Sequence, residues 1–470
     1  MNAIGVAGSF RDPAGRVYEA EGRILRGVDA QAAANFDLLQ QTNTYRAARE
    51  RGTVVASKRL GADHPVARPL IDAGWAAVIE HDRVPLISYP YEWSFSMLKD
   101  AALLQLDLLD TAFDEGWTLK DSTPFNIQFV DAKPIFIDIP SFVPRGAGEP
   151  WLGYRQFCML YLFPLMLTAY RGIPFQGILR ANLDGITPIE MARYFSGWSR
   201  FKKGVLSHVL FPAAMEKRVE ATEKDRAPAK RRAVGRQKDI LVKSLIASMR
   251  RLVASLDIDI KHTAWSEYSK THSYEEDDFR VKKEFVRQAA EAAKAEIVWD
   301  IGSNTGEFSK ICAQSAKHVI AVDGDHDAVD ILYREMRGTG NDCILPLIMN
   351  LANISPNHGW AGVERLAFDQ RNRPDLVIAL ALIHHMALSA NIPIFLFIEW
   401  LASLEAELVI EFVDRDDEMV QKLLTNKKEQ YQGYNKATFI AELEKHFSIV
   451  ARAELKGGTR ELFQCVRRTP

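Results

Sequence analysis

The stretch IVWDIGSNTGEFSKI has the residue types and spacing best suited to chemistry in this chain. It combines an apolar strand with Asp300, Gly302, Asn304 and Gly306, and we expect a helix to begin near Thr305. A strand that turns straight into a helix needs residues without a Cβ where its backbone must approach a ligand. The pattern therefore predicts a ligand-binding loop.

This loop does not match the dinucleotide fingerprint G-x-G-x-x-G. Counted from Gly302, the positions that the fingerprint requires are filled by Asn304 and Glu307. The remaining pattern, D-x-G-x-x-x-G, suits a cofactor that has no pyrophosphate to place at the helix N-terminus, and Asp300 can compensate a positively charged amino-acid moiety. S-adenosylmethionine has these properties, so we expect it to be the cofactor.

Two further strands end in residues that can complete such a site. The strand HVIAVD ends seventeen residues after Gly306 at Asp323, whose carboxylate can accept hydrogen bonds from both ribose hydroxyls; a helix cap or a surface carboxylate is the alternative. The next strand runs into MNLANISP, which places Asn350 and Leu351 beside an adenine. Each signal alone is weak, but their order and spacing together predict a methyltransferase.

The acceptor side of the predicted site has two candidate groups. The fourth strand leads into His384 and His385, at the edge where such sheets bind ligands. Histidine titrates near neutral pH and can take a proton from a nucleophile. Alternatively, one of the pair points into the core or caps the following helix, and the sequence does not favour one over the other as the base. Tyr274, before the cofactor strand, is a candidate lid contact or part of helix packing.

Several carboxylates follow the fifth strand: Glu411, Asp414, Asp416 and Asp417. They can meet a polar or cationic acceptor, or belong to a solvated loop. No metal site is expected, because the four cysteines are scattered without a CxxC pair or a nearby histidine at ligand spacing.

The C-terminal part of the chain alternates strands and helices, as expected of a parallel sheet wound on both faces. The expected strands are Ile297–Ile301, His318–Asp323, Cys343–Ile348, Asp375–Ala381, Glu407–Val413, Phe447–Ala453 and Glu461–Val466. A KGG turn joins the last two, which predicts an antiparallel pair. Five parallel strands closed by such a hairpin are typical of the Rossmann-like methyltransferase fold, whereas a dinucleotide fold usually ends all-parallel.

Composition divides the chain into an N-terminal α+β domain (1–200), a helical basic linker (201–260) and a methyltransferase domain (261–470). In the N-terminal part, an apolar stripe at helical spacing follows Leu98, Ala102, Leu106, Leu109 and Phe113. The boundary is marked between residues 216 and 251 by twelve Lys or Arg against five Asp or Glu. This run predicts a solvated helix pair that joins the two domains, or a patch for an acidic partner or nucleic acid.

The N-terminal domain contains the order Asp121, Asn126, Asp138, which looks like the catalytic loop and metal-binding Asp of protein-kinase-like phosphotransferases. A helix precedes it, as a kinase C-lobe requires. No glycine-rich phosphate loop precedes the set, DIP replaces DFG, and the only VAIK-like string ends at Lys58. A kinase-like fold and a structural hairpin with Asp121 as a turn cap are both open, and we expect no phosphate transfer.

The bulk properties are those of a globular protein, with 47% hydrophobic and 26% charged residues and a net charge of -2. This balance makes nucleic acid an unlikely partner of the whole protein, because a phosphate-binding surface normally shows as a basic excess. The N-terminus has no secretory signal pattern, so we expect a cytoplasmic protein. The most apolar stretch, 157–170, is too short to span a bilayer and contains Pro164, which predicts a buried helix.

The chain resembles a bacterial family of class I S-adenosylmethionine-dependent methyltransferases, nodulation-protein-like, over nearly its whole length. The resemblance rests on SYPYEWSFSMLKDAALLQLDLL, LKDSTPFNIQF with PIFIDIPSF, VWDIGSNTGEFS, DLVIALALIHHMALSANIPI and LVIEFVDRDDEMVQKLL. It implies methyl transfer and names no acceptor. Relatives often carry Asp where Asn350 stands, and an amide oxygen can still accept a hydrogen bond from adenine there.

Together these features predict a two-domain enzyme that methylates a small-molecule or carbohydrate-like acceptor, with the N-terminal domain assisting recognition. An RNA methyltransferase that uses the basic run is one alternative, although that run has no aromatic residues interleaved. A non-catalytic scaffold that retains the fold is the other, and the intact loop from Asp300 to Gly306 argues against it. Nothing in the sequence indicates an oligomeric state.

Overall fold

A computed structural model describes residues 3–222, 235–260, 276–339, 343–424 and 433–468. The chain divides into two compact units, each of which includes a short segment distant in sequence from the rest of it. The first unit comprises Met1–Phe129, Pro134–Asp259 and His358–Arg365, and the second comprises Val130–Lys133, Ile260–Asn357 and Leu366–Pro470.

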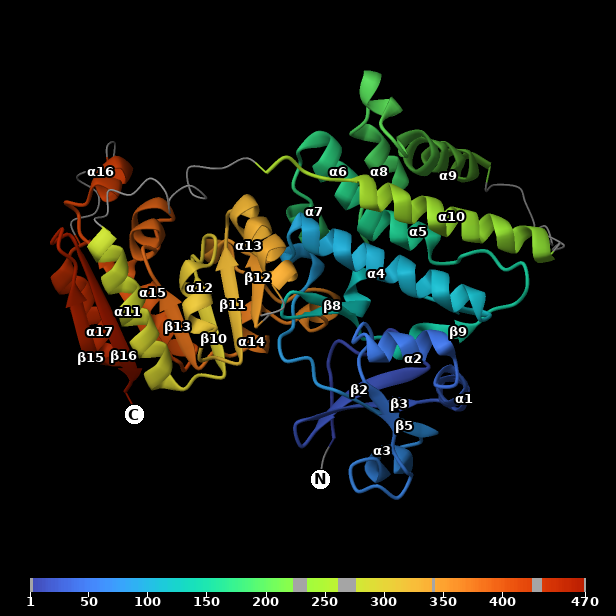
Figure 1. The fold of residues 1–470 in the computed structure, drawn as a ribbon, viewed down its shortest axis with the longest axis horizontal. Helices are drawn as coiled ribbons and strands as arrows, with labels where there is room; N and C mark the ends of the chain where they lie inside the picture. The colour runs from blue at the N-terminus through green and yellow to red at the C-terminus, as the bar shows by residue number, and fades with distance from the viewer. Residues whose placement is uncertain (1–2, 223–234, 261–275, 340–342, 425–432, 469–470) are drawn as a thin grey trace. The chain divides into compact units, whose positions relative to one another are not determined.

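The second unit is built on a seven-stranded sheet with the order β12-β11-β10-β13-β14-β16-β15 (Figure 1). Its strands are β10 (Ile297–Ile301), β11 (His318–Asp323), β12 (Ile344–Ile348), β13 (Leu376–Ala379), β14 (Glu407–Val413), β15 (Phe447–Glu454) and β16 (Arg460–Arg467). The first five are parallel, and β16 runs antiparallel between β14 and β15. The predicted Rossmann-like sheet and its closing hairpin are therefore confirmed.

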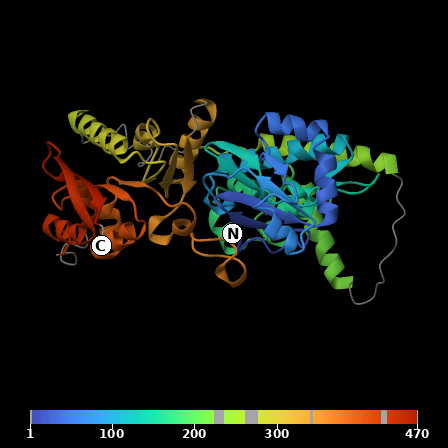
Figure 2. The same ribbon diagram turned by 90° about the horizontal axis from the view of Figure 1, so that it is seen from below.

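Helices cover both faces of this sheet, as Figures 1 and 2 show, with α11 beside α12 on one face and α15 beside α17 on the other. The helices are α11 (Glu276–Ala293), α12 (Glu307–Cys312), α13 (His326–Thr339), α14 (Phe368–Arg371), α15 (Ile394–Ser403), α16 (Glu418–Leu424) and α17 (Lys436–His446). Because both faces are covered, the central strands are continuously apolar; Val319 to Val322 in β11 are all fully buried.

The first unit begins with a five-stranded antiparallel sheet, followed by a mostly helical part. The sheet has the order β1-β2-β3-β5-β4, from β1 (Ile4–Gly5), β2 (Gly15–Ala20), β3 (Arg23–Val28), β4 (Ser57–Arg59) and β5 (Ala77–His81). Two further strand pairs are β6 (Trp117–Leu119) with β9 (Phe142–Pro144), and β7 (Ile127–Val130) with β8 (Lys133–Phe136). The helices are α1 (Ala30–Leu39), α2 (Asn43–Glu50), α3 (Arg68–Asp72), α4 (Phe95–Asp114), α5 (Tyr154–Phe157), α6 (Phe163–Arg171), α7 (Gln176–Ala181), α8 (Pro188–Arg193), α9 (Phe211–Thr222) and α10 (Gly235–Ser255).

Helix α4 is the central helix of this unit, and all five residues of its predicted apolar stripe are buried. It starts at Ser94, whose side chain accepts a hydrogen bond from the Met97 N–H. Its outer face is acidic and packs beside α10. The Lys243 ammonium lies 2.8 Å from Asp110 and 2.9 Å from Asp114.

Part of the expected basic linker is therefore a component of the first unit. Arg250, two turns further along α10 from Lys243, contacts Asp107 on α4 at 2.5 Å. Each such exposed ion pair is worth only about 0–1 kcal/mol, but together they match the charges of the two helices. The basic character of this part of the run is thus explained by a neighbouring acidic helix.

The apolar stretch 157–170 is buried, as predicted. It consists of the end of α5, a π-helical turn at Cys158–Leu162 and α6, and Phe163 and Leu167 have no exposed surface. Among the described residues, no helix is both long enough and apolar enough to cross a membrane.

Candidate functional site

The predicted cofactor loop follows β10 and bends through three left-handed residues. Gly302, Asn304 and Gly306 have φ values of 80°, 50° and 79°. The N–H groups of Gly302 and Ser303 donate to the Val322 carbonyl at 2.8 and 3.0 Å, which fixes the loop against β11. Left-handed backbone is uncommon for a residue with a side chain, and asparagine is among the few that adopt it readily.

The two glycines of this loop are required for different reasons. A Cβ on Gly306 would lie 2.6 Å from a side-chain carbon of Leu332 in α13, so this glycine permits close packing between α12 and α13. A Cβ on Gly302 would meet Leu382 at an ordinary 3.5 Å, so only its φ constrains it within the protein. Helix α12 begins at Glu307 with Gly306 as its N-cap, two residues later than expected.

The carboxylate of Asp323, at the end of β11, accepts hydrogen bonds from two main-chain N–H groups, one in the cofactor loop and one just after β11. One carboxylate oxygen accepts the N–H of Asn304 at 2.8 Å and the other accepts the N–H of Asp325 at 2.8 Å. The side chain is half-buried. Burial raises the pKa of Asp323, against the lowering effect of these two N–H donors. Each oxygen keeps a second lone pair, so the carboxylate can still accept from a ligand.

Asp300 is buried under the loop and accepts a hydrogen bond from the Ser309 hydroxyl. Burial raises the pKa of its carboxyl to about 7, and the nearby Asp323 charge adds to the increase. A neighbouring cation would reverse this shift by favouring the ionised form. Ser309, on α12, was not predicted as part of the site; it holds Asp300 from the next helix.

The remaining predicted cofactor residues lie at or beyond the ends of neighbouring strands. Asn350 is exposed and its amide oxygen accepts the Ala352 N–H at 2.9 Å, capping a short 3₁₀ turn that begins at Leu351. Leu351 is partly buried. Tyr274 lies outside the described residues, so its predicted lid contact stays a prediction.

The histidine pair follows β13, and its two members have different surroundings. His384 is 1% exposed, and burial lowers its pKa to about 3, with His385 and Lys282 contributing in the same direction. His385 is half-buried, with its ring 4.1 Å from that of His384, and burial lowers its pKa as well. Both imidazoles are therefore neutral at pH 7, and the same lowering of the pKa makes His384 a weak base.

A buried charge network connects these strand ends to α11. The Lys282 ammonium lies 2.7 Å from Glu411, and Arg460 pairs with Asp417 at 2.6 Å; their four side chains are at most 9% exposed. Glu411 also accepts the N–H of Ala381 at 2.9 Å. The solvated-loop interpretation is thus wrong for Glu411 and Asp417, because buried carboxylates need partners and find them in these cations.

Ala381 stands at the turn from β13 toward the histidines and has φ 47°. Its hydrogen bond to Glu411 holds this strained turn in place. Leu382, the next residue, faces Gly302 of the cofactor loop. The Lys282 and Glu411 pair therefore supports the segment that lies between the loop and His384.

Lys282 was missed by the sequence analysis, although a signal for it exists. It falls on the buried face of α11, at helical spacing with Val286 and Ala289, which are fully buried. A lysine on an otherwise apolar helical face needs a buried anion, which in this protein is Glu411.

Several buried polar atoms of this unit have no hydrogen-bond partner within the described part of the protein. They include the hydroxyl oxygen of Ser303, in the cofactor loop, and Nδ1 of His384. Buried polar atoms are nearly always paired, so unpaired ones beside a glycine-containing loop fit a site that receives a polar ligand. The donor and acceptor set of the loop is compatible with a nucleoside that carries an amino-acid moiety.

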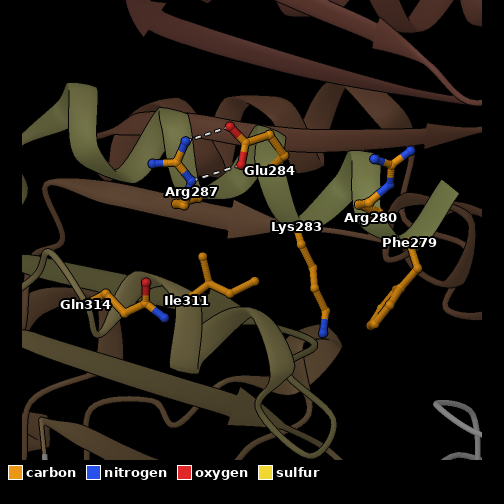
Figure 3. Close-up of a pocket in the computed structure, with 7 residues that line it drawn as sticks. All are labelled: Phe279, Arg280, Lys283, Glu284, Arg287, Ile311 and Gln314. Carbon is orange, nitrogen blue, oxygen red and sulfur yellow. Dashed lines mark hydrogen bonds and ion pairs between the residues drawn. The ribbon is translucent and has the colours of Figure 1, made fainter. Parts of the chain in front are cut away.

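Two surface hollows lie on this unit. The first, drawn in Figure 3, is a groove between α11 and α12 in which Lys283, Arg280 and Arg287 alternate with Phe279 and Glu284. Arg287 is held by two hydrogen bonds to Glu284, and none of the predicted site residues lines the groove. The second is lined by Ala387, Ile392 and Tyr434 among others, directly after the histidine pair.

The Asp121, Asn126 and Asp138 set of the first unit is brought together by the β7–β8 hairpin. Asn126 donates to Asp138 at 3.4 Å, and Arg26 of β3 forms an ion pair with Asp138. Burial raises the pKa of Asp121, with Asp138 as the next cause. Lys58 is exposed and pairs with Glu80 at 3.0 Å instead of with this set. No cluster of metal ligands occurs among the residues that the structure describes.

Comparison with known proteins gives one full-length relative. No family model matches the chain. The nodulation protein NoeA of Rhizobium meliloti (strain 1021) is 31% identical over 461 residues, which are 97% of this chain and 95% of that protein.

Solved structures match only part of the chain. The N-methyltransferase NodS of Bradyrhizobium japonicum WM9, in complex with S-adenosyl-L-homocysteine, is 12% identical, with a TM-score of 0.31 over 41% of this chain and 88% of that one. Magnesium protoporphyrin IX methyltransferase of Synechocystis PCC 6803 is 19% identical, with a TM-score of 0.28 over 42% and 90%. Scores of this size add nothing to what the strand order shows.

Proposed function

Since the chain belongs to the family of the nodulation protein NoeA, we propose that this member is an S-adenosylmethionine-dependent methyltransferase whose reaction centre lies at the carboxyl edge of the second unit's sheet. The observation that carries the proposal is the coupling of the left-handed loop Gly302–Gly306 to Asp323 through the Asn304 N–H. It occurs between β10 and β11 in a sheet of five parallel strands closed by an antiparallel hairpin. Open α/β sheets bind ligands at this edge.

The cofactor would be bound by groups on three strand ends. Asp323 would accept hydrogen bonds from the ribose hydroxyls, and Asn350 with Leu351 would border the adenine. Asp300, below the loop, would compensate the positively charged amino-acid part, which favours the ionised form of a carboxyl whose pKa is otherwise raised. When bound, S-adenosylmethionine supplies a methyl group on a sulfonium centre.

The chain's own contribution to transfer is positioning and proton removal. In-line displacement needs the acceptor atom and the methyl group within near-attack distance in a site closed to water. His385 is the better candidate for the base, because it is half-buried while His384 is almost fully buried. His384, neutral and enclosed, would fix the orientation of its neighbour. The buried pair Lys282 and Glu411 would keep the intervening turn rigid.

We propose a small-molecule or carbohydrate-like acceptor. The hollow after the histidine pair is lined by the apolar residues Ile392, Pro393 and Phe395 and by the polar residues Asn391 and Glu442. This combination suits a ligand with both apolar and hydroxyl surface. An RNA acceptor is disfavoured because Lys243 and Arg250 of the basic run pair with α4.

The acceptor can be found by incubating the full chain with methyl-labelled S-adenosylmethionine and fractionated cell extract. Label in a small-molecule fraction, dependent on His385, supports the proposal. Label confined to RNA contradicts the proposal and indicates an RNA methyltransferase. Cofactor binding without label in any fraction also contradicts it and indicates a non-catalytic scaffold. A His385→Asn variant is the suitable comparison, because it keeps a polar side chain of similar size.

A further inference from the structure

One helical surface of the first unit has exposed apolar side chains that its own core does not use. It consists of a 3₁₀ turn at Gly197–Phe201 and a π-helical turn at Val205–Leu210 that runs directly into α9. Figure 2 shows α9, in green, projecting from the body of the unit. We call this the α9 surface, and its exposed large apolar residues are Trp198 (89%), Phe201 (68%), Leu206 (52%), Phe211 (65%) and Met215 (47%).

The helix that carries three of these residues is apolar on both sides. Its inner side is buried through Val205, Val209 and Ala213, and His208 contacts the Tyr154 hydroxyl at 2.7 Å. A surface helix of a globular protein needs an apolar stripe only where it faces the core. The outward positions of Phe211 and Met215, one turn apart, therefore point to a second surface that they contact.

The charges around these residues are strongly one-sided. Residues 197–218 contain five basic residues, Arg200, Lys202, Lys203, Lys217 and Arg218, and a single acidic one, Glu216. That carboxylate is occupied by Arg155 at 2.8 Å. The following residues 219–238 add seven Lys or Arg against three acidic residues in sequence. The partner of the α9 surface must therefore be anionic as well as able to receive large apolar side chains.

We propose that the α9 surface binds the face of an anionic lipid bilayer. Exposed Trp and Phe are preferred at the boundary between headgroups and acyl chains, and Leu and Met can enter the apolar layer beneath. Lysine and arginine beside them are attracted to negatively charged headgroups. The protein would then be a peripheral membrane protein that is attached through its first unit.

Other partners fit these observations less well. Two copies of the surface would bring two strongly basic patches together, which opposes self-association. Single-stranded RNA would use aromatic rings for stacking but has no use for exposed Leu206 and Met215. A bilayer uses both the rings and the aliphatic side chains.

The test is co-sedimentation of the full chain with vesicles of phosphatidylcholine alone or of phosphatidylcholine containing phosphatidylglycerol. We expect binding only to the anionic vesicles, with a strong decrease at high salt because screening weakens the headgroup attraction. The double variant Trp198→Ser and Phe211→Ser should lose binding. Lys202→Gln with Lys203→Gln should weaken it by about five-fold for each lysine removed.

Two matched controls lie on other elements of the same unit. Leu38→Ser removes from α1 a leucine that is as exposed as Leu206 of the α9 surface, and Arg68→Gln removes an exposed cation from α3. Both variants should bind vesicles as the unmodified chain does. Circular dichroism of every variant checks that the fold is retained.

Three results would overturn the proposal. The first is absence of binding to anionic vesicles by the folded protein, or binding that the Trp198 and Phe211 changes leave unaltered. The second is salt-sensitive RNA binding, without vesicle binding, that the same changes abolish. The third is a dimer in light scattering that Trp198→Ser dissociates, because the surface would then be an interface between copies.

Discussion

The Asp323 carboxylate accepts the main-chain N–H of Asn304 at 2.8 Å, so the end of β11 and the loop after β10 are held by one side chain. Asn304 has a left-handed backbone, which asparagine tolerates better than most residues with a side chain. The hydrogen bond to Asp323 stabilises this conformation further. Asp323 therefore acts on the site in two ways, as a ligand acceptor and as a support for the loop.

Asp323→Ala is expected to weaken S-adenosylmethionine binding by about 1–3 kcal/mol, the cost of leaving hydrogen-bonding groups without their charged partner. Calorimetry on the folded variant measures the loss. Asp323→Asn is the informative control, because its amide oxygen can keep the Asn304 contact while its charge is gone. Unchanged affinity in Asp323→Ala would remove the ribose assignment.

Cofactor affinity is expected to rise with pH between 6 and 8. The pKa of Asp300 is about 7 in the protein without ligand, so its carboxyl is mostly protonated at pH 6 and mostly ionised at pH 8. Only the ionised form attracts a positively charged ligand, which predicts an increase of about ten-fold over this range. Titration calorimetry at several pH values, with Asp300→Asn as the pH-independent comparison, gives the answer. A cofactor affinity that does not change with pH in the unmodified protein would show that the charge of Asp300 does not contribute to ligand binding.

Lys282→Met is expected to destabilise the protein by about 3–5 kcal/mol, because it leaves the Glu411 carboxylate buried without its closest cation. The adjacent Lys283 is a matched control: it is 41% exposed at its side chain and pairs with Glu307, so Lys283→Met should change stability by less than about 1 kcal/mol. Urea unfolding of both variants measures the difference. Equal effects would mean that the buried network does not support the fold of the second unit.

The chain is expected to show no ATP turnover with magnesium. Arg26 pairs with Asp138, and Lys58 is held by Glu80 on the outside of the sheet, so neither the acidic group nor the lysine is arranged for a metal-bound triphosphate. A phosphate-release assay with the intact chain is the check. Turnover that Asp138→Ala abolishes would contradict this prediction.

The sequence was most informative where periodicity and loop chemistry agree. Strands β10, β11 and β14 begin and end at the predicted residues, because apolar runs in a sheet covered on both faces have clear limits. The antiparallel closing pair followed from the KGG turn. The position of β16 between β14 and β15 depends on long-range pairing and was not predicted.

The site was predictable in its residue types but not in its supports. Asp300, Gly302 and Asp323 were predicted from their order and spacing in the sequence. The supporting residues Ser309, Lys282 and Arg460 lie on other helices and strands, and only the tertiary structure brings them to the site. Gly306 was predicted because the backbone must approach a ligand, but the structure gives it a packing role. Its missing Cβ accommodates Leu332, a contact that no local pattern reveals.

The most direct test of the methyltransferase assignment is S-adenosylmethionine binding by the unmodified chain and by Gly302→Val. Gly302 is the better choice than Gly306, since a Cβ at Gly302 meets only an ordinary contact with Leu382 while one at Gly306 would collide with Leu332. A branched residue at φ 80° strains the loop over which the cofactor is expected to lie. We predict that calorimetry detects binding to the unmodified chain and none to a Gly302→Val protein whose circular dichroism is unchanged. A folded Gly302→Val protein that binds with the affinity of the unmodified chain would contradict the account, because the cofactor would not lie over this loop.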